Sequence, residues 1–383
     1  MRVVGIHRVF IPSIILTYDA SLRYLAEAGK LEYKSISLKQ VTSRILNWGD
    51  VFFFGRSDTK LELKIAKLLL KNGKHNLIYV LDDDLLNVPD LSNCSQFYNS
   101  TYVKSVISEM LDICPILASP SKKILEKYGQ GKRNILLEEP ALMQTRLQSS
   151  DSKIIKIGYA GSLDHQSDVD IVIRETLQRL KSKYSDRIQI EFFGAKPSGE
   201  NVIDSTYLPY EKGYLNYLTK LSERKWDIGL IPLIDCEFNS YKHYIKAIEY
   251  TSLGIIPIAS DVYVYHRFYE RFGEIELEKN DVNLWVDLIS YYIDNPDIIP
   301  QKKQRCIELS KHFFIDETSQ GLFQALNTMP ILQDTKTKCI NIKIPFFIQY
   351  YIARLDQVIR VNGVIMCIKK LINNALKNFK IYY

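Results

Sequence analysis

Short apolar runs alternate with amphipathic stretches through the first part of the chain. The runs are rich in Val, Ile and Phe, which is typical of strands buried on both faces of a parallel sheet. The stretches between them carry apolar residues at helical spacing and end near Gly or Asn. Strands are predicted at residues 2–7, 51–55, 76–81, 116–119 and 133–140, and helices at 21–28, 58–72, 100–114 and 121–128.

The same alternation starts again after a polar segment at residues 148–152. Alternating β and α elements predict parallel sheets with helices on both faces. The sequence therefore predicts an α/β protein of two doubly wound, Rossmann-like domains facing a cleft. In this second part, strands are predicted at residues 154–159, 188–193, 227–233 and 255–259, and helices at 168–184 and 214–223.

The segment 226–262 gathers polar side chains between two buried strands. Its helix is expected to carry Lys242, Lys246 and Glu249 and to stop at Gly254. Spacings of four and three residues put the two ammoniums and the carboxylate on one helical face. At the carboxyl edge of a sheet such a face suits a nucleotide diphosphate with its ribose. The alternative is a solvated helix face with a weak ion pair.

Another polar loop follows the strand predicted at 154–159. Gly161 and Ser162 end that strand and precede a helix. Glycine there lets backbone N–H groups approach an anion, with the helix N-terminus behind them. Gly194 similarly ends the strand predicted at 188–193. Each loop is either a ligand-binding loop or an ordinary turn.

The segment 226–262 resembles the nucleotide-sugar-binding part of GT-B glycosyltransferases of the family 4 type. Their helix reads K-x-x-E and is followed by Gly and a strand with Pro, here Lys246, Glu249, Gly254 and Pro257. The resemblance implies a GT-B fold, a nucleotide-diphosphate-sugar donor, no further cofactor, no metal and transfer with retention of configuration. It also implies that Glu249 holds the ribose hydroxyls of the donor.

Two departures from this family pattern concern charge. Where the family carries an Arg and a Lys that neutralise the donor diphosphate, this sequence has Ser162 and Ser167. Where the family often has a Glu that contacts the transferred sugar, it has Tyr241. Departing negative charge needs preorganised cations or donors. Lys242 and Lys246 are therefore the candidates to stabilise the leaving diphosphate.

Further candidates come from the loop after Gly161 and from the second strand end. Asp164, His165 and Asp168 follow the pattern GS-x-x-H-x-x-D of a subset of the superfamily, which makes His165 a candidate contact to phosphate or acceptor, or else a surface histidine. Relatives place the base-binding loop at the position of Gly194. The predicted donor site thus consists of Gly161, Ser162, His165, Gly194, Lys242, Lys246 and Glu249.

Three consecutive aspartates follow the strand predicted at 76–81. GT-B relatives often end this strand with a His or Asp that faces the cleft, so Asp82 and Asp83 are candidates to orient acceptor or sugar. Two alternatives stay open. One is a DxD-type metal site of a GT-A glycosyltransferase, where carboxylates hold a divalent ion. The other is capping of a helix near Leu85.

Length and charge set the frame for these motifs. The 383 residues suffice for two domains, expected at 1–147 and 153–330, with a tail at 331–383. The net charge is +6, and residues 331–383 hold nine Lys and Arg against two Asp, so the body is near neutral. A nucleic-acid reader would carry its basic residues on the folded body. Nucleic acid is therefore not an expected partner.

The tail at 331–383 combines Ile, Phe and Tyr with basic residues. We expect basic amphipathic helices, which lie either on the surface of an inner membrane or against the first domain. The six cysteines are scattered, no run of about 18 apolar residues occurs, and no signal peptide is evident. A reduced, cytoplasmic protein, peripheral at the cytoplasmic face of the membrane if the tail binds lipid, is the expectation.

The sequence thus predicts a glycosyltransferase that moves a sugar from a nucleotide-sugar to a glycan, lipid-linked and destined for cell-surface polysaccharide. Asp82, Asp83 and Lys246 are its predicted catalytic residues. Two alternatives remain: a non-catalytic GT-B-like nucleotide-binding scaffold, favoured by the missing cations, and a GT-B polyol-phosphate transferase, which would need a histidine-rich cleft.

Overall fold

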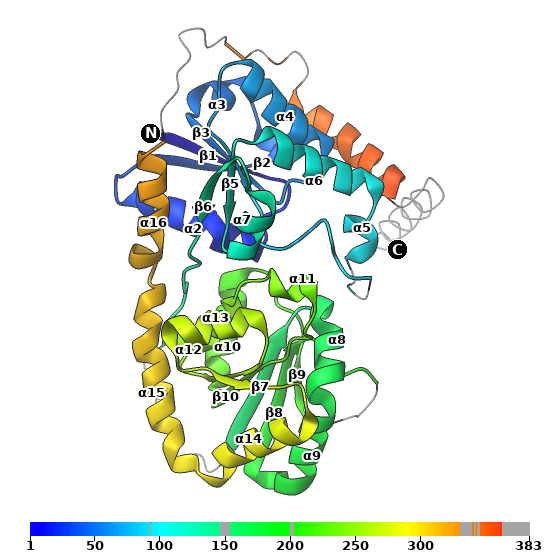
Figure 1. The fold of residues 1–383 in the computed structure, drawn as a ribbon, viewed down its shortest axis with the longest axis vertical. Helices are drawn as coiled ribbons and strands as arrows, with labels where there is room; N and C mark the ends of the chain where they lie inside the picture. The colour runs from blue at the N-terminus through cyan, green and yellow to red at the C-terminus, as the bar shows by residue number, and fades with distance from the viewer. Residues whose placement is uncertain are drawn as a thin grey trace, which may run out of the picture.

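The computed structural model describes residues 1–90, 92, 94–145, 154–199, 203–329, 339–340, 342 and 345–361. Within them the chain forms two domains, one above the other in Figure 1, each built on a six-stranded sheet. The α/β class and the two doubly wound domains predicted from the sequence are confirmed. The polar segment at 148–152 lies outside the described residues.

The N-terminal sheet has the strand order β2-β1-β3-β4-β5-β6, with every neighbouring pair parallel. Helices cover both faces, so central strands are apolar throughout: Phe52, Phe53 and Phe54 are fully buried. The strands are β1 (Arg2–His7), β2 (Glu32–Ser37), β3 (Val51–Gly55), β4 (Leu77–Val80), β5 (Ile116–Ser119) and β6 (Arg133–Leu136). The helices are α1 (Pro12–Ile14), α2 (Ala20–Glu27), α3 (Ser43–Trp48), α4 (Lys60–Lys71), α5 (Ser95–Tyr98), α6 (Thr101–Ile113) and α7 (Lys122–Tyr128).

The C-terminal sheet has the order β12-β11-β10-β7-β8-β9 and is also parallel. Gly158 of β7 lies so close to the indole of Trp226 that a Cβ would come within 1.9 Å of the ring. The strands are β7 (Ile155–Gly161), β8 (Ile188–Gly194), β9 (Thr206–Leu208), β10 (Ile228–Ile231), β11 (Ile256–Ser260) and β12 (Glu276–Glu278). The helices are α8 (Gln166–Asp168), α9 (Arg174–Tyr184), α10 (Tyr214–Arg224), α11 (Glu237–Ser240), α12 (Ile245–Ser252), α13 (Tyr263–Phe272), α14 (Val282–Asp294), α15 (Ile299–Leu309) and α16 (Ile315–Asn327).

Both sheets have a topological switch point, where the strand order reverses. It lies between β1 and β3 in the N-terminal sheet and between β7 and β10 in the C-terminal sheet. Doubly wound folds bind ligands beyond the carboxyl ends of the strands at such points. The two carboxyl edges face each other, because Lys242 of the loop before α12 reaches Asp83 at the end of β4. Any ligand held by one edge therefore lies next to the other.

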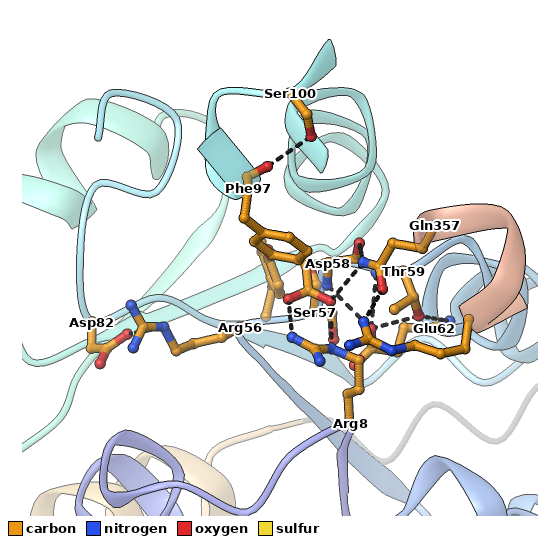
Figure 2. A network of polar contacts seen from close by, with 12 residues as sticks. Arg8, Arg56, Ser57, Asp58, Thr59, Glu62, Asp82, Phe97, Ser100 and Gln357 are labelled. Carbon is orange, nitrogen blue, oxygen red and sulfur yellow. Dashed lines mark hydrogen bonds and ion pairs between the residues drawn. The ribbon is translucent and has the colours of Figure 1, made fainter. Parts of the chain in front are cut away.

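The loop from β3 into α4 is held by a buried polar network (Figure 2). Thr59 caps α4, and one oxygen of Glu62 accepts hydrogen bonds from the N–H groups of Asp58 and Thr59 and from the Thr59 hydroxyl, which forms a capping box. Arg8 binds the Asp58 carboxylate with two hydrogen bonds of 2.8 and 2.7 Å. Gln357 donates to the Asp58 carbonyl at 3.1 Å. The switch point of the N-terminal sheet is thus filled by protein side chains.

The chain returns to the N-terminal domain after α15. Leu322 and Leu326 of α16 and Met329 pack in the same core as Leu22 of α2. Residues 346–361, called the C-terminal helix below, lie beside α4 and α6 in orange-red in Figure 1. The predicted boundary at residue 330 therefore does not separate the domains in space, because an apolar face of α16 covers the N-terminal sheet. Of the two expectations for the tail, docking on the first domain describes the C-terminal helix.

Prediction and structure agree best for buried strands: β1, β3 and β5 have the predicted bounds. The sequence pattern missed β2 (Glu32–Ser37), which pairs with β1 at the sheet edge. In β2 only Ile36 is buried, so the strand lacks the apolar run that marks its neighbours. An edge strand needs little apolar surface, and this segment forms a strand because it pairs with β1.

Candidate active site

Lys246 and Glu249 lie together on α12, as predicted. Their side chains form an ion pair with 2.7 Å between Lys246 Nζ and Glu249 Oε2. The helix holds them in place because Ala247, Ile248 and Tyr250 are buried beneath it. The geometry of α12 therefore places Lys246 and Glu249 next to each other.

Two tyrosines that the sequence did not single out complete this cluster. Tyr214 donates to Glu249 Oε1 at 2.7 Å, and Tyr217 donates to Oε2 at 3.0 Å. Lys246 in turn donates to the Tyr217 hydroxyl at 3.0 Å. Burial and the Glu249 charge raise the pKa of both tyrosines well above 10.0, so they stay protonated donors. Glu249 is 6% exposed, and both its oxygens are occupied by protein donors.

The N-terminal domain closes over these tyrosines. Leu16, from the π-helical turn that follows α1, packs with Tyr214 and Leu218 of α10 in a buried apolar cluster. This contact joins the switch-point side of one domain to α10 of the other. The Glu249 carboxylate consequently lies behind two rings and an interdomain contact. Tyr214 and Tyr217 are three residues apart on α10, and this aromatic pair is the feature of the sequence that could have identified them.

Lys242 is not on α12, which corrects the prediction that one helix carries Lys242, Lys246 and Glu249. The helix begins at Ile245, and a separate short helix, α11 (Glu237–Ser240), precedes it. The side chain of His243, between them, is 6% exposed and is hydrogen-bonded through Nδ1 to Glu139 at 2.7 Å. This anchor holds the loop outside the helix. Lys242 therefore points across the domain interface rather than along the face of Lys246.

Asp82 and Asp83 lie at the interface between the domains, around the guanidinium of Arg56. Arg56 Nε is 3.1 Å from Asp82 Oδ1, Arg56 Nη2 is 3.1 Å from Asp83 Oδ2, and Lys242 Nζ is 3.5 Å from Asp83 Oδ1. Arg56 has a φ of 47°, a left-handed conformation that is uncommon for a residue with a side chain. Arg56 directly follows β3, a position that could have marked it in the sequence.

The two neighbouring aspartates have pKa values displaced in opposite directions. Burial raises the pKa of Asp82, although the charge of Arg56 opposes this. Burial also disfavours the charge on Asp83, but Lys242, Arg56 and His165 outweigh it and lower the pKa of Asp83. The difference follows from their contacts, because Arg56 contacts both carboxylates and only Asp83 is also reached by Lys242.

Asp84 faces away from this pair. Its carboxylate is bound by Lys127 at 2.9 Å, Tyr128 at 2.6 Å and Asn87. The three consecutive aspartates thus have different partners and do not converge. Among the residues that the structure describes, no group of three or more His, Cys, Asp or Glu side chains could hold a metal ion.

The loops at Gly161 and Gly194 lie side by side at the ends of β7 and β8. Ala195 donates its N–H to the Gly161 carbonyl at 2.8 Å. Gly194 has a φ of +92°, and a Cβ there would lie 2.1 Å from the Gly161 oxygen. Ser162 follows in extended conformation before a short 3₁₀ turn. Only glycine fits at 194, so this contact fixes the shape of the β7 loop.

His165 and Asp168 form a hydrogen-bonded pair in the loop after β7. His165 Nδ1 is 2.9 Å from Asp168 Oδ2, and Asp168 Oδ1 accepts from the N–H of Ile234 at 2.9 Å. Asp168 is buried, whereas His165 is partly exposed. The carboxylate therefore orients the imidazole and ties the β7 loop to the segment after β10. The charge of His165 also helps to lower the pKa of Asp83, which links His165 to Asp83 rather than to Glu249.

Apart from the loop residues Gly161, Ser162 and Gly194, the predicted residues thus fall into two groups. Lys246 and Glu249 form one, closed by Tyr214 and Tyr217. Asp82, Asp83, Lys242 and His165 form the other, organised by Arg56 and Asp168.

No protein-family model matches the sequence, and no curated protein matches it. Solved structures do match. HepE from Anabaena, in complex with UDP and glucose, superposes with a TM-score of 0.57 at 11% identity, covering 86% of this chain and 100% of that chain. The E. coli trehalose-6-phosphate protein bound with UDP-2-fluoro glucose gives 0.56 at 11% identity, covering 86% and 100%.

A protein from Listeria monocytogenes described as a UDP-N-acetylglucosamine 2-epimerase gives a TM-score of 0.53 at 11% identity, covering 89% of this chain and 99% of that chain. At these identities the likeness shows the fold alone. From its two parallel sheets and these neighbours, the chain has the GT-B fold.

Proposed function

We propose that this protein is a glycosyltransferase that moves a sugar from a nucleotide-diphosphate sugar to a glycan acceptor. The observation that carries the proposal is the Lys246–Glu249 pair at the start of α12, next to the switch point of the C-terminal sheet. The GT-B neighbours crystallised with UDP, glucose and UDP-2-fluoro glucose support the same ligand class.

In this proposal the donor binds the C-terminal domain. Glu249 accepts hydrogen bonds from the ribose hydroxyls, and the backbone of Gly161 and Ser162 faces the diphosphate. Lys246 and Lys242 stabilise the charge that develops as the diphosphate leaves, which is the main demand of glycosyl transfer. Both ammoniums are partly exposed at the interface.

Donor binding then requires a rearrangement. Tyr214 and Tyr217 occupy both oxygens of Glu249, so ribose hydroxyls must replace the tyrosine hydroxyls. Exchange of one hydrogen bond for another costs little net free energy, about 1 kcal/mol or less per bond. The interdomain contact of Leu16 with Tyr214 must loosen at the same time.

The acceptor side is proposed to be the N-terminal edge. Asp82 and Asp83 face the loop of Lys242, so an acceptor or the transferred sugar lying between the domains would meet both. We further propose a lipid-linked glycan for cell-surface polysaccharide, retention of configuration, no metal and no cofactor beyond the donor. A cytoplasmic enzyme, peripheral at the membrane, would fit that acceptor.

Nucleotide binding tests the proposal directly. The protein is incubated with a panel of UDP-, GDP- and TDP-sugars, and the melting temperature and nucleotide release are recorded. We expect one donor to raise the melting temperature by a few degrees. Lys246→Ala and Glu249→Ala should lose that shift, each measured against its own ligand-free melting temperature. Activity unchanged by EDTA is expected for a metal-independent enzyme.

Lys302→Ala is the matched control, because Lys302 forms a Lys–Glu pair in the same domain, with 2.9 Å to Glu276 at the amino end of β12. It should keep the full ligand-induced shift. If both Lys246→Ala and Glu249→Ala bind as the wild type does, the donor site is misplaced.

The second candidate is a non-catalytic GT-B scaffold. It is favoured by the complete occupation of Glu249 by protein donors and by Ser162 and Ser167 in place of the two cations. A melting temperature that no nucleotide changes would select it over the transferase.

A further inference from the structure

The C-terminal helix has one face attached to the N-terminal domain. Phe346 is buried in the N-terminal core, with Tyr350 and Ala353 packed against it. Gln357 is fully buried and bonded to Asp58. These residues recur at spacings of three and four, so they form a single inner face. The helix is thereby held flat along the surface of the domain.

The opposite face carries a stripe of large apolar side chains that contact water. The five residues are 41% to 64% exposed and follow one another at helical spacing: Phe347, Ile348, Tyr351, Ile352 and Leu355. Single exposed apolar residues are ordinary on protein surfaces, but a contiguous apolar stripe marks an interaction surface. We call these five residues the outer stripe.

Cations border the outer stripe. Lys39 lies over the rings of Tyr350 and Tyr351, at 5.0 and 5.2 Å from their centroids. Lys64 donates to Gln349 at 2.8 Å, and Arg354 donates to Gln357 at 2.6 Å.

Within the described residues, none of these three cations forms an ion pair with an acidic side chain. The acid of the helix, Asp356, is paired with Arg360. The net charge around the stripe is therefore positive. Residues 362–383, which lie outside the described part of the chain, contain four lysines and no acidic residue.

An amphipathic helix with an apolar face and a basic border suits the interface of an anionic bilayer. Apolar side chains enter the region of the headgroups and upper acyl chains, while ammoniums remain at the phosphates. A protein partner for the same stripe would need acidic complementarity and a matched apolar groove. No helix of the described residues is long and apolar enough to cross a membrane, so the helix would lie on the surface.

We propose that the outer stripe and its basic border bind the surface of an anionic lipid bilayer, with the C-terminal helix lying flat between the bilayer and the N-terminal domain. The proposal does not depend on the glycosyl transfer proposed above. Lipid binding is proposed for the C-terminal helix and nucleotide binding for α12, so either property can fail while the other holds.

Sedimentation with vesicles tests the proposal. The full chain is mixed with vesicles of phosphatidylcholine alone or with a third of phosphatidylglycerol. Binding is expected to the anionic vesicles and to weaken as salt is added. A variant with Tyr351→Ser, Ile352→Ser and Leu355→Ser should partition at least about tenfold less. Lys39→Gln and Lys64→Gln should each lower binding to anionic vesicles about fivefold.

The matched control is Tyr269→Ser with Tyr291→Ser, which removes two tyrosines of similar exposure, 55% and 54%, from the C-terminal domain. It should bind vesicles as the wild type does. Far-ultraviolet dichroism and the melting temperature verify that each variant is folded.

Three results would overturn the proposal: no binding of the wild type to anionic vesicles, wild-type binding by the triple variant, or equal loss in the control. A dimer in sedimentation velocity that dissociates only in the triple variant would assign the stripe to self-association instead. The nucleotide-induced shift of the melting temperature is recorded for every variant and is expected to be unchanged.

Discussion

Lys242 and Asp83 join the two domains through side chains that are 159 residues apart in the chain, with 3.5 Å between Nζ and Oδ1. The two side chains are 20% and 21% exposed, so solvent screens their attraction only in part. Arg56 holds Asp83 from the other side. The pair is the electrostatic link between the carboxyl edges of the two sheets.

Removing this pair should cost a small, measurable amount of stability. A double-mutant cycle of Asp83→Ala and Lys242→Ala, followed by thermal unfolding, is expected to give a coupling of about 0.5–1 kcal/mol at low salt. The exposed pair Lys67–Glu109 in the N-terminal domain is the control and should couple less. Because the pKa of Asp83 is lowered in the folded protein, the coupling is present above its ordinary pKa of 3.8 and is lost as the pH falls further. A coupling equal to that of the control would show that the interface is open in solution.

Tyr217→Phe should strengthen donor binding. The substitution removes the hydroxyl that donates to Glu249 Oε2 and accepts from Lys246 Nζ. A ribose hydroxyl then no longer competes with Tyr217 for Glu249. The dissociation constant for the nucleotide-sugar is expected to fall about fivefold, which corresponds to one hydrogen bond of about 1 kcal/mol. Tyr184→Phe, which breaks a Tyr–Asp294 hydrogen bond of 2.7 Å in the same domain, should leave calorimetric affinity unchanged. Weaker binding by Tyr217→Phe would mean that its hydroxyl contacts the donor itself.

Glu62 should make the free energy of unfolding fall as the pH rises from 4.5 to about 7. Burial, together with the neighbouring Asp58 and against the charge of Arg8, raises the pKa of Glu62 to about 7. Above the ordinary value of 4.5 the unfolded chain carries the charge while the folded protein does not, so stability is fully present below 4.5 and is lost up to about pH 7. Glu62→Gln keeps the capping acceptor and removes the charge.

The pH series compares melting temperatures of the wild type and Glu62→Gln between pH 5 and 8. As the pH rises, the free energy of unfolding of Glu62→Gln is expected to increase relative to that of the wild type, by an amount on the order of 2 kcal/mol at pH 8. Parallel curves for the two proteins would show that Glu62 is already ionised when folded.

Gln357→Ala should release the C-terminal helix from the N-terminal domain. The substitution leaves the buried carbonyl of Asp58 without this donor, and a buried unpaired group costs about 1–3 kcal/mol. Amide hydrogen exchange in residues 346–361 is expected to accelerate, while that of α12 stays the same. Gln301→Ala, at an exposed position of α15, should change neither. Unchanged exchange in Gln357→Ala would mean that the apolar inner face alone holds the helix.

The sequence by itself determined the parts that depend on local pattern. Apolar runs specified the buried strands, because a strand covered on both faces has no polar positions. Lys246 and Glu249 could be paired from their spacing, because helical geometry fixes neighbours three residues apart. The alternation of strands and helices likewise determined the two doubly wound domains.

Only the tertiary structure decided which groups those local elements meet. Glu249 is bound by Tyr214, 35 residues away, and Asp58 by Gln357, 299 residues away. Lys242 turned from the predicted helix toward Asp83 because His243 is anchored on Glu139. Such contacts form between residues that are far apart in the sequence. They depend on how the two domains and the C-terminal helix pack against each other, and the local spacing of residues gives no information about that packing.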